Sequence, residues 1–174
     1  MSKTSARSRG IYLETFFGTA EIGLFAVPTE NICLIPPRLK LRQKRLIQEV
    51  LGVKAISTTL AGSILLSPMA AGNSNGLILS KMVLDEEMEK IKKSAGDINI
   101  GLLESKYTAV GNLILVNDKA ALISTILPKK AEKLIQDILG VEVIRGRIAN
   151  SKGAIIGSVT TGPEMMTISR ALGV

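Results

Sequence analysis

Three near-copies of one short stretch decide how this chain folds: GNSNGLILS at 72–80, VNDKAALIS at 116–124 and ANSKGAIIGS at 149–158. The Asn in each turn recurs after 44 residues and then after 33. A step that recurs at a fixed length is the sign of an internal repeat. The chain therefore repeats a unit of 44 residues, and its last copy is 11 residues short.

A second marker keeps the same steps. A glycine follows each amphipathic stretch, at intervals of 44, 44 and 33 residues, and an isoleucine recurs at the same intervals five residues earlier. Because turn residues and apolar residues stay in register, the repeat is a structural unit. The glycines are Gly52, Gly96, Gly140 and Gly173, and the isoleucines are Ile47, Ile91, Ile135 and Ile168.

The second unit predicts the order strand, strand, strand, helix. Residues 53–61 and 64–72 are read as strands, and the turn NSNG opens a third strand. Residues 85–95 carry apolar residues at helical spacing, with acidic residues in the first turn and lysines near the end. Gly18 lies 44 residues before Gly62, so residues 10–18 match the first of these strands. We therefore expect an α/β fold built from repeated β-β-β-α units.

The fourth unit lacks one strand. Ala149 is followed directly by Asn150, whereas the second unit has an 11-residue stretch, GSILLSPMAAG, at that point. We expect three full units plus one lacking a strand, arranged as a pseudo-symmetric ring that residues 10–18 close near the fourth unit. Residues 10–174 would then form one repeat domain, preceded by a flexible basic arm at 1–9. This predicts a monomer, with a dimer that covers the exposed sheet edge as the alternative.

Composition argues against catalysis. The chain has no histidine, which is the commonest general acid or base near neutral pH and the commonest metal ligand, and it has one cysteine. Cys33 matches Leu77 and Ala121 at the repeat interval, so we read it as a buried core thiol. We expect no enzyme activity, no cofactor and no metal site. Neither a secretory signal nor a membrane-spanning stretch is evident, which favours a cytoplasmic protein.

The segment RLKLRQKRLIQE at 38–49 is strongly basic within a chain of formal net charge +7. Only Glu49 opposes its five cations. A solvated helix face and a contact with nucleic acid are equally open interpretations. The five residues are Arg38, Lys40, Arg42, Lys44 and Arg45.

Two further features are candidate binding elements. The turns headed by Asn73 and Asn117 could bind a partner, although turn chemistry alone explains Asn and Gly there. Gly111 and Asn112 fall inside a predicted strand, where both residue types are depleted. Such a pair predicts a bulge or a close approach by a partner, and a purely internal packing role is equally open.

Several motifs resemble one known family. TAEIGLFAVPTEN, KYTAVGNLILVNDKAALI, ILGVEVIRG and ANSKGAIIGSVTTGPE are similar to segments of the archaeal and eukaryotic translation initiation factor 6 family, and the resemblance covers residues 11–174. That family has the pentein fold, five α/β units around a pseudo-fivefold axis. The resemblance implies that this chain is internally shortened by one unit of 44 residues and one strand of 11.

The resemblance also implies a function. Family members bind the intersubunit face of the large ribosomal subunit, near the L14-type ribosomal protein and the sarcin-ricin loop, and prevent the small subunit from joining. The family's contact segment matches residues 109–112, and its Asn is implicated in holding the ribosomal protein. The candidate ribosome-binding residues are Thr108, Gly111, Asn112, Asn73 and Asn117.

Two other classes of function stay open. An RNA-binding or ribosome-binding module could keep the fold without the anti-association activity. The guanidine-modifying hydrolases share the pentein fold and resemble this chain in repeat pattern only. They need a Cys nucleophile with His and acidic partners, so a chain without histidine fits that class poorly.

Overall fold

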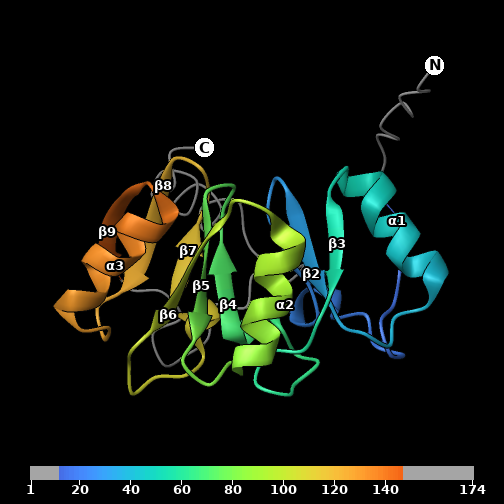
Figure 1. Cartoon of the computed structure of the whole chain (residues 1–174), viewed down its shortest axis with the longest axis horizontal. Helices are drawn as coiled ribbons and strands as arrows, with labels where there is room; N and C mark the ends of the chain where they lie inside the picture. The colour runs from blue at the N-terminus through green and yellow to red at the C-terminus, as the bar shows by residue number, and fades with distance from the viewer. Residues whose placement is uncertain (1–11, 147–174) are drawn as a thin grey trace, which may run out of the picture.

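Three similar modules lie in series along the molecule in the computed structural model, which describes residues 12–146 (Figure 1). Each module holds a β-hairpin, a helix and a third strand. The first module contains β1 (Val27–Pro28), β2 (Ile32–Ile35), α1 (Leu41–Leu51) and β3 (Lys54–Ser57). The second contains β4 (Ala70–Gly72), β5 (Gly76–Ser80), α2 (Asp85–Ala95) and β6 (Asn99–Leu103). The third contains β7 (Ile114–Val116), β8 (Ala120–Ser124), α3 (Lys129–Leu139) and β9 (Glu142–Gly146).

Each module forms its own three-stranded sheet. The hairpin strands pair antiparallel, and the strand after the helix lies parallel to the strand before it. The hairpin register repeats: Ala71 pairs with Ile78, and Leu115 pairs with Leu122, 44 residues further on. The predicted α/β repeat is therefore confirmed over these three modules, while the fourth unit and the closure of a ring lie outside the described residues.

The strands are shorter than predicted and are grouped differently. The predicted strand 53–61 ends at Ser57, and of 64–72 only Ala70–Gly72 is strand. Pro68 lies in a short 3-10 helix, η2 (Ser67–Met69), where its missing N–H breaks no strand pairing. The order strand, strand, strand, helix holds along the chain. The third strand joins the sheet of the preceding hairpin because a helical crossover returns the chain parallel to the strand it left.

The strand predicted over residues 10–18 is absent from the described part of that range, because residues 12–19 contain no strand. They form a turn at 16–19 that matches the turn at 60–63, 44 residues later. Phe17 and Gly18 have positive φ, as do Ala61 and Gly62, and each pair forms the centre of a tight turn closed by two backbone hydrogen bonds. Positive φ at both central residues is typical of a hairpin turn. The predicted pairing of 10–18 with the fourth unit involves residues 1–11 and 147–174, which lie outside the described range.

The helices follow their sequence signals. Helix α2 begins at Asp85, one residue earlier than an N-cap at Asp85 would place it, with Glu86 and Glu87 also in its first turn. Acidic side chains there complement the positive end of the helix dipole. No helix within residues 12–146 is long and apolar enough to cross a membrane.

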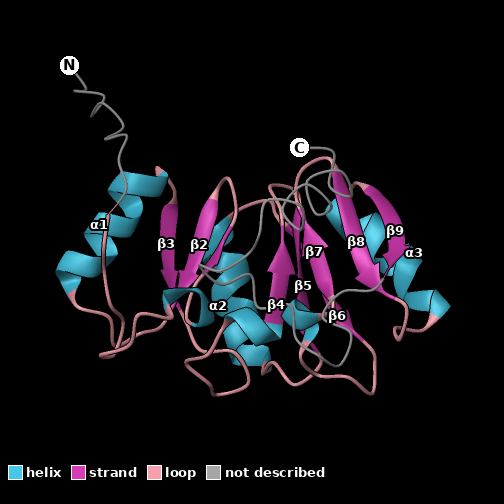
Figure 2. Ribbon diagram, turned by 180° about the vertical axis from the view of Figure 1, so that it is seen from behind, coloured by secondary structure: helices cyan, strands magenta, loops and turns pink. Residues whose placement is uncertain are grey.

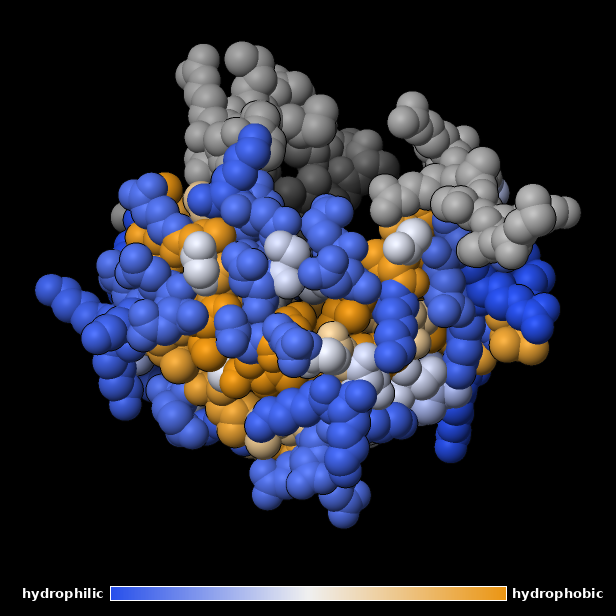
Figure 3. Space-filling view, turned by 45° about the horizontal axis from the view of Figure 1, so that its top comes forward, coloured by the Kyte–Doolittle hydropathy of each residue, from blue (hydrophilic) through white to orange (hydrophobic). Residues whose placement is uncertain are grey.

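The core is aliphatic and lies between helices and sheets, with the helices on one side of the strands (Figure 2). Leu34, Leu77, Ile78 and Ile123 are fully buried. On one face of the molecule, hydrophilic side chains project widely and leave smaller apolar patches between them (Figure 3). Exposed apolar side chains include Leu41 and Leu51 of α1.

Candidate functional site

The repeated turn has a structural role in the second and third modules. The side-chain oxygen of Asn73 accepts hydrogen bonds from the N–H groups of Asn75 (3.0 Å) and Gly76 (3.1 Å). Asn117 accepts from Lys119 and Ala120, at 2.9 and 3.0 Å. The side chain folds back on its own loop and closes it, as an Asx turn does.

Asn73 also joins two modules. Its amide donates to the carbonyl oxygens of Leu139 (2.9 Å) and Asn117 (3.3 Å), both in the third module. The side chain is buried, at 3% exposure. A partner could not reach Asn73 without opening this contact, so the internal interpretation holds for Asn73. Asn117 is only half-buried.

Residues 110–112 do not lie in a strand. Val110–Asn112 form a 3-10 helix, η3, and the strand β7 begins only at Ile114. The strand predicted through Gly111 and Asn112 is therefore wrong at these two residues. The turn forms because the N–H groups of Asn112 and Leu113 donate to the carbonyls of Ala109 and Val110, at 3.1 and 2.9 Å.

Gly111 faces the inside of the protein. A Cβ atom added to it would lie 1.8 Å from the carbonyl oxygen of Ser67 and 2.7 Å from that of Ala70. The close backbone approach predicted at this glycine does occur, and the approaching chain is η2 and β4 of the preceding module. Internal packing therefore explains Gly111.

Asn112 points outward beside it. The residue is exposed, and its side-chain amide makes no hydrogen bond with any residue of 12–146. It lines a hollow of about 360 Å³ together with Lys106, Tyr107, Thr108, Ala109 and Leu113. The structure thus brings Asn112 and half-buried Thr108 together in one accessible place, which we call the Asn112 hollow.

The Asn112 hollow includes two residues that the sequence interpretation left out. The Lys106 Nζ lies 5.0 Å from the centre of the Tyr107 ring, within range of a cation–π contact. Tyr107 is one of only two tyrosines in the chain, and it lies within the segment that resembles the family. These two facts could have identified it as a candidate binding residue. An amide, a hydroxyl, an ammonium group and an aromatic ring suit a polar macromolecular partner.

The five cations of 38–45 form a second accessible surface, the basic surface, at the N-terminal end of α1. Arg38, Lys40 and Arg45 are exposed. The other two have internal partners: Arg42 pairs with Glu14 at 2.5 Å, and the Lys44 Nζ donates to the Ser57 hydroxyl at 2.9 Å. Arg38 and Arg45 make no ion pair with any residue of 12–146.

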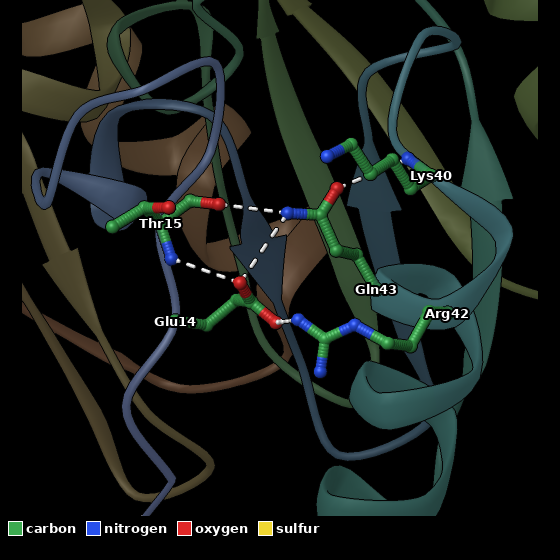
Figure 4. Close-up of polar contacts among 5 residues, drawn as sticks. All are labelled: Glu14, Thr15, Lys40, Arg42 and Gln43. Atoms are coloured by element: carbon green, nitrogen blue, oxygen red, sulfur yellow. Dashed lines mark hydrogen bonds and ion pairs between the residues drawn. The ribbon is translucent and has the colours of Figure 1, made fainter.

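A polar network fastens residues 14–15 to α1 beneath this surface (Figure 4). Buried Gln43 donates to the Thr15 carbonyl at 2.7 Å and accepts from the Lys40 N–H at 3.0 Å. The Thr15 N–H, helped by Gln43 and Arg42, holds the pKa of the Glu14 carboxyl below its usual 4.5, although partial burial acts the other way. Arg42 therefore stabilises a turn as well as adding positive charge.

The basic surface has no counterpart in the second module. The equivalent positions of the second module, 44 residues later, hold no cation and two glutamates. The fold therefore forms there without positive charge, which leaves the charge of the first module free to serve a partner. Those residues of the second module are Met82, Leu84, Glu86, Met88 and Glu89.

The Asn112 hollow and the basic surface are separate. η3 packs against β4, β5 and β7, whereas α1 packs on β3 of its own module. Different residues line the two places. A partner that touches both must be large.

Cys33 does not behave as a nucleophile. It is 1% exposed, its thiol donates toward the Leu34 carbonyl at 3.7 Å, and burial raises its pKa to about 12. A thiol with such a pKa stays protonated, and the thiolate is the reactive form. The prediction of a buried core cysteine is confirmed.

These observations describe an α/β repeat protein whose accessible candidate residues suit binding. Residues 11–152 match the model of the eIF-6 family. Translation initiation factor 6 of Pyrococcus horikoshii is 33% identical over 218 residues, and that of Methanocaldococcus jannaschii is 34% identical over 219, each covering 91% of this chain and 96% of the relative. The chain therefore belongs to the eIF-6 family, the one whose motifs its sequence resembles, and these relatives are named as translation initiation factors.

One solved structure is similar at a lower level. Campylobacter jejuni agmatine deiminase has a TM-score of 0.46 and 13% sequence identity, with 71% of this chain and 49% of that chain covered. A likeness at this level says nothing about function.

The relatives are longer than this chain. The alignment with the Pyrococcus protein runs over 218 positions and covers 91% of this chain's 174 residues, about 158, so about 60 positions (218 − 158) have no counterpart here. That number exceeds one repeat of 44 residues. The chain is thus an internally shortened member of its family, as the shortened last repeat indicates.

Proposed function

We propose that this chain binds the large ribosomal subunit on its intersubunit face and blocks association with the small subunit. Membership of the eIF-6 family supports a role in translation initiation. The observation that carries the proposal to particular residues is the exposed amide of Asn112, at the position that matches the family's contact segment. No catalytic step is involved, and the protein acts in the cytoplasm.

The Asn112 hollow is the proposed contact with the L14-type ribosomal protein near the sarcin-ricin loop. Asn112 offers a donor and an acceptor that no residue of 12–146 occupies, and Thr108 lies in the same hollow. Gly111 acts indirectly, because its close packing on Ser67 holds η3 in place. Asn73 and Asn117 likewise shape the repeat, and Asn117 is the more accessible of the two.

The intact chain, added to purified archaeal subunits, is expected to keep them apart in a sucrose gradient. Asn112→Ala should require a several-fold higher concentration, because a lost interfacial hydrogen bond costs about 0.5–1.5 kcal/mol. Its melting temperature should stay nearly unchanged, since the amide makes no bond within 12–146. Gln136→Ala, which removes an exposed amide from α3, is the control and should act like the parent. Joined ribosomes that persist at saturating concentrations of the intact chain would overturn the proposal.

A second candidate function is binding to RNA or the ribosome without anti-association activity. Two observations favour it: a basic surface of five cations in the first module that the second module lacks, and a chain at least one repeat shorter than its relatives. A shorter body could dock without reaching the position that blocks the small subunit. Binding to large subunits together with unimpeded joining would select this candidate.

The basic surface should contribute a salt-dependent part of ribosome binding. In the double variant Arg38→Ala, Arg45→Ala, the slope of log affinity against log salt should fall by about one unit for each lost phosphate contact, because fewer counterions are released. These two residues are chosen because they have no ion-pair partner within 12–146, so their loss leaves the network around Gln43 intact. Lys133→Ala, at the position in α3 equivalent to Arg45, is the control. A slope equal to that of the parent would make the basic surface merely a solvated helix face.

A further inference from the structure

Each of the second and third helices is covered by two sheets. Ile91 of α2 packs in one cluster with Ile56 of the preceding sheet and Leu77 of its own, and it is 0% exposed. Ile135 of α3 is also 0% exposed, in a cluster with Ile78 of the preceding sheet. A helix in this repeat therefore needs the sheet of the module before it.

Helix α1 has no such sheet among residues 12–146. Its equivalent residue, Ile47, is only half-buried, in a cluster confined to the first module and its flanking loops. Leu51 on the same helix is 45% exposed. An apolar groove of about 280 Å³ opens beside the helix, lined by residues that include Phe16, Ile22, Leu46, Ile47 and Val50. We call it the α1 groove.

Helix α3 shows what the α1 groove lacks. Ile138 and Leu134 of α3 lie against β5 and β6: a Cβ atom on Gly76 or Gly101 would meet Ile138 within 3 Å. The residues of α1 at the same repeat positions are Val50 and Leu46, and both line the open groove. The α1 groove thus lacks a neighbouring sheet with a glycine in its central strand, where a helix can approach closely as α3 does at Gly76.

The 3-10 turns give independent support. Gly23 occupies in the first module the position of Gly111 in the third. A Cβ atom on Gly111 would strike η2, whereas one on Gly23 would meet no atom of residues 12–146 within 4 Å. Gly23 lines the α1 groove, so helix and turn lack a neighbour at the same place.

One segment of this sequence matches the missing strand. Residues 153–157, GAIIG, occupy the repeat positions of β5, GLILS, and Gly153 falls where Gly76 receives Ile138. Within the described residues α3 packs on β5, the central strand of the module before it. The segment 153–157 therefore has the sequence that the α1 groove would bind.

The chain connection places this segment on a second copy. Six residues separate Gly146 at the end of β9 from Gly153, whereas 18 separate Ser57 from Gly76 and 16 separate Leu103 from Ala120. The seven Cα–Cα steps from Gly146 to Gly153 span about 24 Å at full extension. A compact body of this size is roughly 35 Å across, and α1 and β9 lie at opposite ends of the longest axis in both ribbon views (Figures 1 and 2). Of the two alternatives that the sequence leaves open, this geometry favours the dimer.

We propose that two copies of this chain exchange their C-terminal segments, so that residues 153–157 of each copy cover the α1 groove of the other. A short connection that cannot fold back onto its own chain is the usual origin of such an exchange, and a reciprocal exchange closes on itself as a dimer. Both apolar grooves are then buried.

Light scattering after gel filtration tests the proposal. The intact chain is expected to be a dimer at micromolar concentration. Val50→Glu should raise the dimer dissociation constant by about tenfold or more, because it buries a carboxylate in an apolar groove. Gln48→Glu adds the same charge on the exposed side of α1 and should leave the dimer intact. Far-UV circular dichroism of both variants should match the parent, which shows that α1 has formed.

A cross-link separates exchange from closure within one chain. In the variant Val50→Cys, Ala154→Cys, oxidation should give covalent dimers. A parent that stays monomeric, or a cross-link that forms within a single chain, would overturn the proposal. Neither result bears on the proposed function, which is measured with ribosomal subunits and the Asn112 variant.

Discussion

Gly111→Ala should lower the free energy of unfolding by about 3 kcal/mol or more. The new Cβ would lie 1.8 Å from the Ser67 carbonyl oxygen and 2.7 Å from that of Ala70. Both atoms belong to the backbone, so no side chain can rotate away and η3 must separate from the second module. In a domain of this size the melting temperature should fall by about 10 °C, as measured by circular dichroism or calorimetry.

Gly23→Ala is the matched control for that change. Gly23 has the same position in the first module, and a Cβ atom there would meet no described residue within 4 Å. The melting temperature should change by little, because both glycines lie in 3-10 turns without positive φ. Equal losses of stability in the two variants would show that the close contact between η2 and η3 is not what requires glycine at position 111.

The comparison separates two neighbours that the sequence treats as a pair. Gly111→Ala should impair ribosome binding only in proportion to the protein it unfolds, whereas Asn112→Ala should impair binding in a protein that stays folded. The two residues face opposite directions, one toward Ser67 and one into the Asn112 hollow. From a single sequence, a glycine that a neighbouring module requires looks the same as one that a partner requires.

The repeat made the rest of the fold predictable. A fixed 44-residue step identified the helices, the hairpin turns and the buried cysteine, because each position could be read in several copies. Strand ends were less accurate. Positive φ at Ala61 and the short helix at Ser67–Met69 interrupt two predicted strands, and both depend on local geometry that β-propensity does not report.

The candidate site was less predictable than the fold. The sequence named Asn112, but it gave Asn73 the same status, although Asn73 is buried between two modules. The hydrogen bonds of the Asn73 amide with Leu139 and Asn117 show that Asn73 is internal, and the sequence does not reveal them. The sequence also did not predict the partners of Arg42 and Lys44. Glu14 lies 28 residues from Arg42 along the chain, and Ser57 lies 13 residues from Lys44.

Glu87→Ala is expected to destabilise the protein by about 3 kcal/mol, because one carboxylate holds four donors. It accepts hydrogen bonds from the Thr59 hydroxyl at 2.6 Å and from the N–H groups of Ala61, Gly62 and Leu84 at 2.7, 2.9 and 3.0 Å. These bonds fasten the turn at 59–62 to the start of α2. The equivalent residue of the first module, Gln43, fastens Thr15 in the same place with an amide.

The effect should depend on pH in a definite direction. Burial raises the pKa of Glu87, but the hydrogen bonds from Thr59, Leu84, Gly62 and Ala61 outweigh it, so the pKa of the folded state lies below the usual 4.5. A lowered folded pKa means that the stabilisation is complete above about pH 4.5 and is lost as the pH falls through the folded value. Urea unfolding near neutral pH and at about pH 3 should therefore show a larger difference between the parent and Glu87→Gln near neutral pH. Glu86→Gln, an exposed neighbour on α2, should show little difference at either pH. A Glu87→Gln penalty that is the same at both pH values would mean that the turn at 59–62 is held by the shape of the side chain and owes nothing to its charge.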